Sequence, residues 1–168
     1  MTIATPPAQA TNAELIRWAF DQINTRDVSA LKQFWTDETY ERFPNAECHG
    51  SDEIAAYFES VLAALPDFRI EVVNVAAEND DVYVHWHMTG THSGAAWFGV
   101  EPTGKRVEMD GIDHFVLREG MVVSNFVVFD QTQFARAVGM LPPDGSGADR
   151  AMKAAFNART KLMRRLGR

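Results

Sequence analysis

The spacing of apolar positions along the chain changes from a helical period to a strand period near Phe68. Upstream of this point, apolar residues recur every three or four positions, and each such segment follows a residue suited to cap a helix. The predicted helices are 15–23 after a capping box at Thr11 and Glu14, 28–35 after Asp27, and 52–65 after Ser51. The segment 40–50, between the second and third helices, has no clear period, and we interpret it as a loop.

From Phe68 onward, apolar and polar residues alternate, which is the period of a half-buried strand. Four strands are predicted, at 68–78, 82–92, 106–117 and 121–130, followed by a short helix at 131–138. The turns between them are short, and helices precede an antiparallel meander. This order predicts an α+β fold in which the helices pack on one face of a curved antiparallel sheet.

One acidic residue interrupts the apolar side of the strand 106–117. Val107, Met109, Phe115 and Leu117 share a face with Asp113. Gly111 lies on the same face and leaves room beside the carboxylate. Burying an unpaired carboxylate costs free energy, so we expect Asp113 to have either a hydrogen-bonding partner in the core or a functional role.

The neighbouring strand offers a second polar group for the same interior. If Asn125, Val127 and Phe129 face inward, Asn125 joins Asp113 in an otherwise apolar space. Few polar groups in an apolar cleft are typical of a small-molecule site. The alternative is an Asp–Asn or Asp–Arg pair that satisfies itself in the core. Asp130 has a structural interpretation, because Asp-x-x-Gln is suited to cap the helix that follows.

The histidines of 82–92 divide between the two faces of that strand. His85 and His87 point away from the apolar side, and no third ligand lies nearby in sequence, so we expect no metal site there. His92 falls on the inward side, where it could line a pocket mouth or close a turn.

Composition places the chain among single-domain proteins. Its 168 residues are 46% hydrophobic and suffice for one sizeable core. A single cysteine, Cys48, excludes an intramolecular disulfide and favours a reducing cytoplasm. The N-terminus does not resemble a signal peptide, and no segment is apolar enough for a membrane span.

Charge separates the end of the chain from the rest. Residues 148–168 carry seven Lys and Arg against one acid, a net charge of +6, which leaves −13 on residues 1–147 out of a total of −7. The net negative charge of residues 1–147 would repel phosphate groups and argues against nucleic-acid binding. The tail has an apolar stripe of helical spacing. We expect it to dock on an acidic body or on a dimer mate, with an acidic protein or an anionic membrane as less favoured partners.

The stretch GTHSGAAWFGVEPTGKRVEMDGIDHFVLREGMVVSNFVVFDQTQFARAVG resembles SnoaL-like polyketide cyclases of the nuclear transport factor 2-like superfamily. The GTHSG and PTGK motifs, the turn between the last two strands and the final D…F…VG carry the likeness, which extends more weakly back to Thr11. The resemblance implies a cone-shaped curved sheet wrapped by helices around a deep apolar pocket, in a homodimer. The expected organisation is a disordered N-terminus at 1–10, the family domain at 11–141, a linker at 142–147 and a basic helical tail at 148–168.

The resemblance also implies roles for individual residues. IDHF matches the ketosteroid isomerase segment whose aspartate stays protonated and donates to an oxyanion, which gives Asp113 that role. The isomerase's base would fall near Phe43. Tyr40 and Arg42 stand where limonene epoxide hydrolases hold water. The cyclase and epoxide hydrolase aspartates are replaced by Val127, and the hydrolase's Arg and second Asp by Trp86 and Met88, so each known machinery is incomplete.

These observations predict a small-molecule enzyme that performs acid/base cyclisation, isomerisation or dehydration on an apolar ring or polyketide-like substrate, without metal or organic cofactor. The candidate catalytic residues are Asp113, His92, Tyr40, Arg42 and Asn125. The candidate substrate-binding residues are Trp18, Trp86, Met88, Phe115, Val127 and Phe129. Arg42 decides the state of Asp113: if it is distant, burial raises the pKa of the carboxyl, and if it is near, the carboxylate stays charged. The alternatives are a non-catalytic binding module for an apolar ligand and an interaction protein that acts through its tail.

Overall fold

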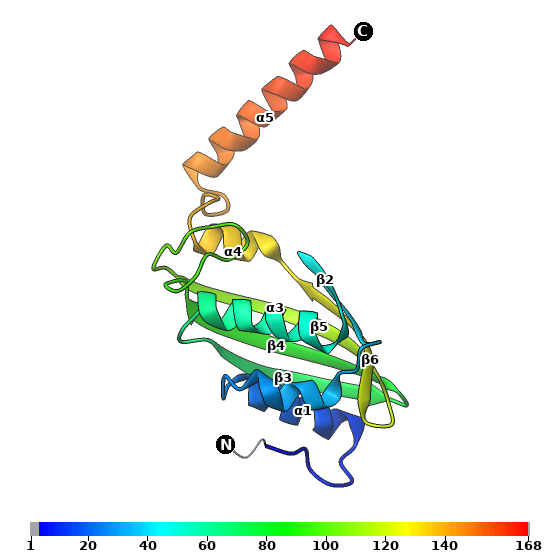
Figure 1. Ribbon diagram of the computed structural model, residues 1–168. Helices are drawn as coiled ribbons and strands as arrows, with labels where there is room; N and C mark the ends of the chain where they lie inside the picture. Colours follow the sequence, from blue (N-terminus) through cyan, green and yellow to red (C-terminus); the bar gives the residue numbers. More distant parts are fainter. Residues whose placement is uncertain (1–3, 168) are drawn as a thin grey trace.

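The computed structural model describes residues 4–167 and contains one six-stranded sheet with helices on one of its faces (Figure 1). The helices are α1 (Asn12–Ile23), α2 (Val28–Leu31) with a 3-10 turn η1 (Lys32–Phe34), α3 (Gly50–Ala64), α4 (Gln131–Ala137) and α5 (Gly147–Leu166). The strands are β1 (Tyr40–Phe43), β2 (Ala46–His49), β3 (Arg69–Glu78), β4 (Asp81–Thr91), β5 (Arg106–Arg118) and β6 (Met121–Phe129). The predicted α+β class is confirmed.

The four long strands form the antiparallel meander that the alternating pattern predicts. Strand order across the sheet is β2-β1-β6-β5-β4-β3. Side chains alternate between an inner face, which packs against α1, α2 and α3, and an outer face with exposed positions. The core therefore lies between these helices and the inner face of the curved, unclosed sheet.

The segment 40–50 is a β-hairpin and not the predicted loop. β1 and β2 pair in antiparallel fashion around a turn at Pro44 and Asn45, and β1 also pairs in parallel with β6. Each strand has only four residues, which is too short for a period to stand out in the sequence. This correction matters because β1 adds side chains to the interior.

Of the three helix caps predicted before Phe68, two are confirmed and one is wrong. Thr11 forms a capping box with Glu14, and the side chain of Asp27 accepts from the backbone of Ser29. Ser51 does not cap the third helix, because α3 already begins at Gly50 with His49 as its N-cap. The Glu53 side chain accepts a hydrogen bond from the His49 backbone nitrogen at 2.8 Å, which satisfies an N-terminal donor.

The ends of the chain differ in how they meet the body. Residues 4–10 form an irregular segment, in which the Ala4 carbonyl accepts from Gln33, and the expectation of disorder at residues 1–3 lies outside the described residues. α5 leaves α4 and extends away from the sheet (Figure 1). It does not dock on the body of its own chain, because every residue of α5 except Asp149 is exposed. Within residues 4–167, no helix is long and apolar enough to cross a membrane.

Candidate functional site

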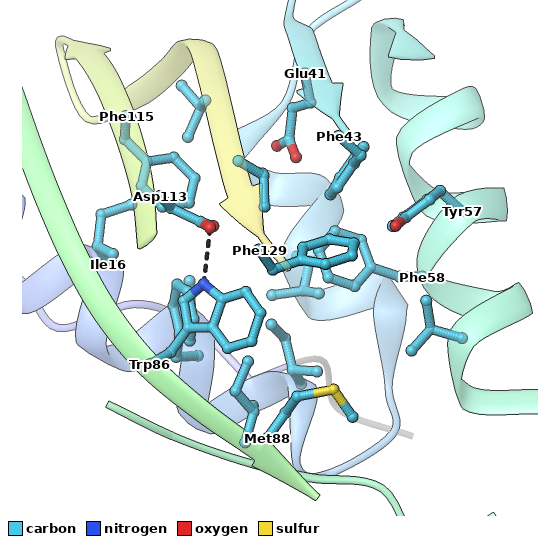
Figure 2. Close-up of a pocket in the computed structure, with 18 of the residues that line it drawn as sticks. Ile16, Glu41, Phe43, Tyr57, Phe58, Trp86, Met88, Asp113, Phe115 and Phe129 are labelled. Carbon is cyan, nitrogen blue, oxygen red and sulfur yellow. Dashed lines mark hydrogen bonds between the residues drawn. The ribbon is translucent and has the colours of Figure 1, made fainter. Parts of the chain in front are cut away.

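A cavity of about 100 Å³ lies between the helices and the inner face of the sheet. Aromatic and aliphatic side chains from α1, α3 and the strands form most of its wall (Figure 2). Three polar side chains also reach the wall, namely Glu41, Tyr57 and Asp113. The cavity is therefore apolar with a small number of polar groups, which is the profile of a small-molecule site.

Asp113 lies on the inner face of β5, and the residue is 6% exposed. The indole nitrogen of Trp86 donates a hydrogen bond to its Oδ1 at 2.7 Å (Figure 2). Trp86 stands directly opposite Gly111 in the β4–β5 pairing. A methyl group at Gly111 would lie 2.1 Å from the Trp86 ring, so the glycine makes room for the indole that holds Asp113.

Glu41 supplies a second buried carboxyl beside Asp113. It lies on β1 with its side chain inward and is 1% exposed. β1 pairs with β6 and β6 with β5, and Glu41 stands opposite Asn125 in this arrangement. The Asn125 amide donates to Asp113 Oδ2 at 3.2 Å and to Glu41 Oε2 at 3.4 Å. One side-chain amide thus bridges two buried acids from neighbouring strands.

Burial raises the pKa of both carboxyls. The pKa of Glu41 rises to about 8, mainly because burial penalises its charged form and further because the charge of Asp113 is near. Burial raises the pKa of Asp113 to about 6, against the opposing hydrogen bonds from Trp86 and Asn125. These hydrogen bonds favour the ionised form of Asp113. Near neutral pH, the pair therefore holds one proton, which resides on Glu41.

Tyr57 is the third polar group of the wall. Its ring stacks on Phe43 with 3.8 Å between centroids, and its hydroxyl donates to Asn45 Oδ1 at 3.1 Å. Asn45 belongs to the β1–β2 turn, so the hairpin and α3 position this hydroxyl together. Burial raises the pKa of the Tyr57 hydroxyl far above its usual range. The phenol stays protonated at neutral pH.

The structure brings together two of the five predicted catalytic residues, Asp113 and Asn125. Tyr40 and Arg42 are not beside them, because they alternate with Glu41 and Phe43 and face the other side of β1. The Arg42 guanidinium lies 5.2 Å from the centre of the Phe126 ring on that outer side. Arg42 is thus distant from Asp113. Of the two alternatives for this carboxyl, the one in which burial raises the pKa of Asp113 therefore applies.

His92 is inward and fully buried, as the alternation predicts, but it lies outside the cavity. Its ring meets Phe134 edge-on at 5.7 Å, and it is absent from the cavity wall. Neither ring nitrogen has a hydrogen-bond partner among the described residues. No contact connects His92 with the carboxyl pair.

The predicted wall residues fall mostly where the alternation places them. The cavity wall includes Trp86, Met88, Phe115, Val127 and Phe129. Trp18 is not part of the wall, since its ring packs against Phe34 with 5.5 Å between centroids. α1 reaches the cavity through other residues, among them Ile16 and Phe20.

The outward placement of His85 and His87 and the capping role of Asp130 agree with the structure. His85 and His87 lie on the outer face, where His87 contacts Asp110 at 3.0 Å and Glu108 at 3.3 Å. In the part of the chain described here, no group of three or more His, Cys, Asp or Glu side chains is arranged to hold a metal ion. Asp130 caps α4, accepting from the Thr132 backbone at 2.8 Å.

Glu41 and Tyr57 are the two polar wall residues that sequence reasoning missed. Glu41 falls in the segment interpreted as a loop, which hides the alternation of inward Glu41 and Phe43 with outward Tyr40 and Arg42. The Pro-Asn pair between two short β-prone segments was the available signal. Glu41 stands two residues before Phe43, near which the family resemblance places an isomerase base, and on the same face of β1.

Comparison with known proteins settles the family. The model of the SnoaL-like polyketide cyclase family matches residues 13–138. The chain belongs to this family. Membership supports a catalytic role on a small molecule, and the region outside the match includes α5. A comparison with curated protein sequences gives no significant match.

Several solved structures share the fold. AclR, a candidate hydroxylase from Streptomyces galilaeus, is 27% identical, with a TM-score of 0.69 over 78% of this chain and 97% of its own. A candidate SnoaL-like polyketide cyclase from Jannaschia sp. CCS1 is 24% identical, with a TM-score of 0.71 over 78% and 93%. IdmH from Streptomyces antibioticus, a candidate polyketide cyclase, is 20% identical, with a TM-score of 0.67 over 77% and 99%.

Proposed function

We propose that the protein is an acid/base enzyme that acts on an apolar ring or polyketide-like substrate carrying a carbonyl group. The observation that carries this proposal is the pair of buried carboxyls, Asp113 and Glu41, on the wall of an otherwise apolar cavity. Two acids whose environments push their pKa values apart supply a base and an acid at the same pH. The names of AclR and IdmH, a candidate hydroxylase and a candidate cyclase, agree with small-molecule chemistry on this fold.

Asp113 acts as the base in this proposal. Its hydrogen bond from Trp86 stabilises the carboxylate and fixes its direction. The carboxylate removes a proton from a carbon next to the substrate carbonyl. This assignment departs from the role implied by the family resemblance, in which Asp113 is the protonated donor, because the Asn125 amide lies farther from Glu41 than from Asp113 and Glu41 keeps the proton.

Glu41 acts as the acid. Its carboxylic acid proton passes to the carbonyl oxygen as negative charge develops there, which gives an enol, a protonated Asp113 and an ionised Glu41. Return of the proton at a different carbon completes an isomerisation. Attack of the enol carbon on a second carbonyl of the same substrate completes a cyclisation. In both cases the two carboxyls recover their initial protonation states.

The cavity wall supports an apolar ring as the class of substrate. Aromatic side chains such as Trp86, Phe43 and Phe129 surround the carboxyl pair (Figure 2). Flat aromatic walls suit a ring system, which buries apolar area without needing many hydrogen bonds. The polar groups lie together, so the substrate would present one polar edge and an apolar remainder.

Exchange of carbon-bound protons tests the proposal without knowledge of the natural substrate. Three ring ketones, 2-tetralone, anthrone and cyclohexenone, are incubated in deuterated buffer at pH 7, and loss of the proton next to the carbonyl is followed by NMR. We expect the wild-type protein to accelerate exchange for at least one ketone and Asp113→Asn to reduce that acceleration by roughly 100-fold or more. The matched control is Asp110→Asn, an exposed acid on the outer face of the same strand.

The outcomes separate the proposed enzyme from a binding module. Exchange no faster than in buffer for all three ketones would contradict catalysis by the carboxyl pair. Ketone binding by wild type and Asp113→Asn alike, without exchange in either, would support the non-catalytic binding module. Equal loss of exchange in Asp110→Asn and Asp113→Asn would show a general charge effect and not a site.

A further inference from the structure

The helix α5 lies outside the part of the chain that matches the family. It has 20 residues, so it is about 30 Å long, and among them only Asp149 is buried. Packing of an apolar face supplies most of the stability of helices in proteins. The described part of the chain provides no such packing for α5, so the helix presents its surface to another molecule.

One side of α5 is apolar. At about 100° per residue, five large apolar side chains fall within about 120° of the helix circumference. We name them the apolar side of α5, and they are Met152, Phe156, Leu162, Met163 and Leu166. All five are exposed, and Phe156 is exposed to 66%. A helix of a globular protein normally buries a side of this width.

The opposite side of α5 is basic. Five of the six Lys and Arg side chains of the helix fall within a second arc of about 120°, centred opposite the apolar side. We name them the basic side, and they are Arg150, Lys153, Lys161, Arg164 and Arg165. Arg159 is the exception, because it lies on the apolar side, where its long stem can follow the apolar surface to a polar layer. The helix is therefore amphipathic, with one apolar side and one cationic side.

Ion pairs link only the base of α5 to the rest of the chain. Asp149 accepts hydrogen bonds from the Gly145 backbone nitrogen at 3.1 Å and from Lys153 Nζ at 2.7 Å. Asp144 forms ion pairs with Lys153 at 3.1 Å and with Arg136 of α4 at 3.4 Å. These contacts join α4, the linker and the first turn of a helix that leads away from the sheet (Figure 1).

The distal part of α5 carries positive charge without a partner in this chain. Among residues 4–167, no ion pair includes Arg159, Lys161, Arg164 or Arg165. These side chains begin about 18 Å along the helix axis from Gly147, at 1.5 Å per residue. Physiological salt screens charge over about 8 Å, so the net charge of −13 on residues 1–147 acts on them only weakly.

We propose that α5 docks on an anionic membrane surface and lies in the plane of the interface. An amphipathic helix with Phe and Leu on one side and Lys and Arg on the other places its apolar side at the acyl boundary and its cations among the headgroups. A groove in a protein would cover the apolar side and leave the opposite basic side in water, whereas anionic headgroups and the surface potential act on both. The inference is independent of the chemistry in the cavity.

A second copy of the chain is a less suitable partner for α5. From the sequence, a dimer mate is a favoured partner of the tail, and the exposed Phe126 on the outer face of the sheet is the kind of surface it would need. The Arg42 guanidinium lies over the Phe126 ring at 5.2 Å from its centre. A basic helix would meet a like charge there, which opposes docking.

Co-sedimentation of the full chain with vesicles tests the proposal. One set of vesicles contains equal parts of phosphatidylglycerol and phosphatidylcholine, and the other contains phosphatidylcholine alone. We expect the partition coefficient of the wild type to be roughly tenfold or more higher for the anionic vesicles, because their surface potential attracts the basic side. Raising NaCl from about 0.1 M to about 0.5 M should reduce this difference, because salt screens it.

Two pairs of variants separate the contributions of the two sides. Phe156→Ser/Met163→Ser should lower the partition coefficient for anionic vesicles roughly 100-fold, at about tenfold for each apolar anchor, whereas Ala154→Ser/Asn157→Ser, off the apolar side, should change it less than twofold. Arg164→Gln/Arg165→Gln should lower it roughly tenfold, whereas the charge-retaining Arg164→Lys/Arg165→Lys should change it less than twofold. All six positions are exposed, so these variants leave the core intact.

A fluorescent label reports which side of α5 enters the membrane. Met163→Cys and Ala154→Cys lie on opposite sides of the helix, and each is labelled with nitrobenzoxadiazole under native conditions, in which the buried Cys48 is protected. With anionic vesicles, emission from position 163 should shift to shorter wavelength and gain intensity, because the label enters an apolar layer. Emission from position 154 should change little.

Three results would overturn the proposal. The first is a wild-type protein that binds anionic vesicles no better than neutral ones. The second is binding that Phe156→Ser/Met163→Ser reduces less than twofold, or equal spectral shifts at positions 163 and 154, since either would mean adsorption without insertion of the apolar side. The third is a wild-type dimer in sedimentation equilibrium that Phe156→Ser/Met163→Ser dissociates, without vesicle binding, which would assign α5 to a second copy.

Discussion

Glu41→Gln should make the protein more stable at alkaline pH, and its advantage over wild type should grow as pH rises. Burial raises the pKa of Glu41 from 4.5 to about 8. Between these values the folded protein keeps a proton that the unfolded chain releases, so wild-type stability falls as pH increases. Glutamine has the same shape, carries no charge at any pH and can still accept the hydrogen bond from Asn125.

The size of the effect follows from the pKa shift. At about 1.36 kcal/mol per pKa unit, the Glu41 carboxyl removes about 4 kcal/mol of wild-type stability between pH 5 and pH 9. Glu41→Gln should escape this loss, since it has no proton to release at that position. Urea denaturation followed by tryptophan fluorescence at pH 5, 7 and 9 gives the free energy of unfolding of each protein.

The matched control is Glu101→Gln, an exposed glutamate between β4 and β5. It should follow the wild-type pH dependence closely, because its carboxyl is hydrated in both states. Parallel curves for wild type and Glu41→Gln from pH 5 to pH 9 would refute the reasoning. They would mean that Glu41 ionises at its ordinary pKa and that the cavity holds no shared proton.

Three further predictions concern the same site. Gly111→Ala should push the Trp86 ring off Asp113 and destabilise the protein by about 1–3 kcal/mol, whereas Gly147→Ala, in open space, should not, as thermal denaturation would show. The rate of proton exchange in a ring ketone should be bell-shaped in pH, rising near pH 6 as Asp113 ionises and falling near pH 8 as Glu41 loses its proton, and a flat profile would exclude the pair. A steroid, terpenoid or aromatic polyketide at about 100 times its dissociation constant should raise stability by roughly 2.7 kcal/mol in a thermal-shift assay, and a shift that Asp113→Asn leaves unchanged would place the ligand elsewhere.

The fold was largely predictable because its long strands alternate cleanly. Four strands of nine to thirteen residues leave enough positions for a period of two to stand out, and the helices before them carry capping residues. The short β1–β2 hairpin was not predictable in this way. Its four-residue strands give too few positions for a pattern, and a single Pro-Asn turn is compatible with a loop.

Only those features of the site that depend on the alternation within a single strand were predictable. Alternation places Asp113 and Trp86 on inward positions but leaves the face of Asn125 open, and Gly111 makes room for a neighbour beside Asp113. That this neighbour is the Trp86 indole depends on the register between two strands, which the sequence does not specify. Arg42 shows the same limit. Its distance from Asp113 depends on which face of β1 it occupies, and β1 was not recognised as a strand in the sequence.

The helix α5 illustrates a different limit. Its amphipathic pattern predicts the helix, but from the sequence alone the segment 142–147 before it was interpreted only as a linker. The ion pairs among Arg136, Asp144, Lys153 and Asp149 form a network that spans 17 positions and links α4, the linker and the first turn of α5. A linker rich in Gly and Pro is therefore compatible with a defined orientation when side chains on both sides bind each other.

The most direct measurement is a ¹³C NMR titration of the Glu41 and Asp113 carboxyl carbons, assigned with Glu41→Gln and Asp113→Asn. We predict one titration near pH 6 for Asp113 and one near pH 8 for Glu41, and a lower pKa for Glu41 in Asp113→Asn, because a like charge is removed. Titration of both carboxyls near or below 4.5, unaffected by either substitution, would contradict the shared proton and with it the acid/base pair.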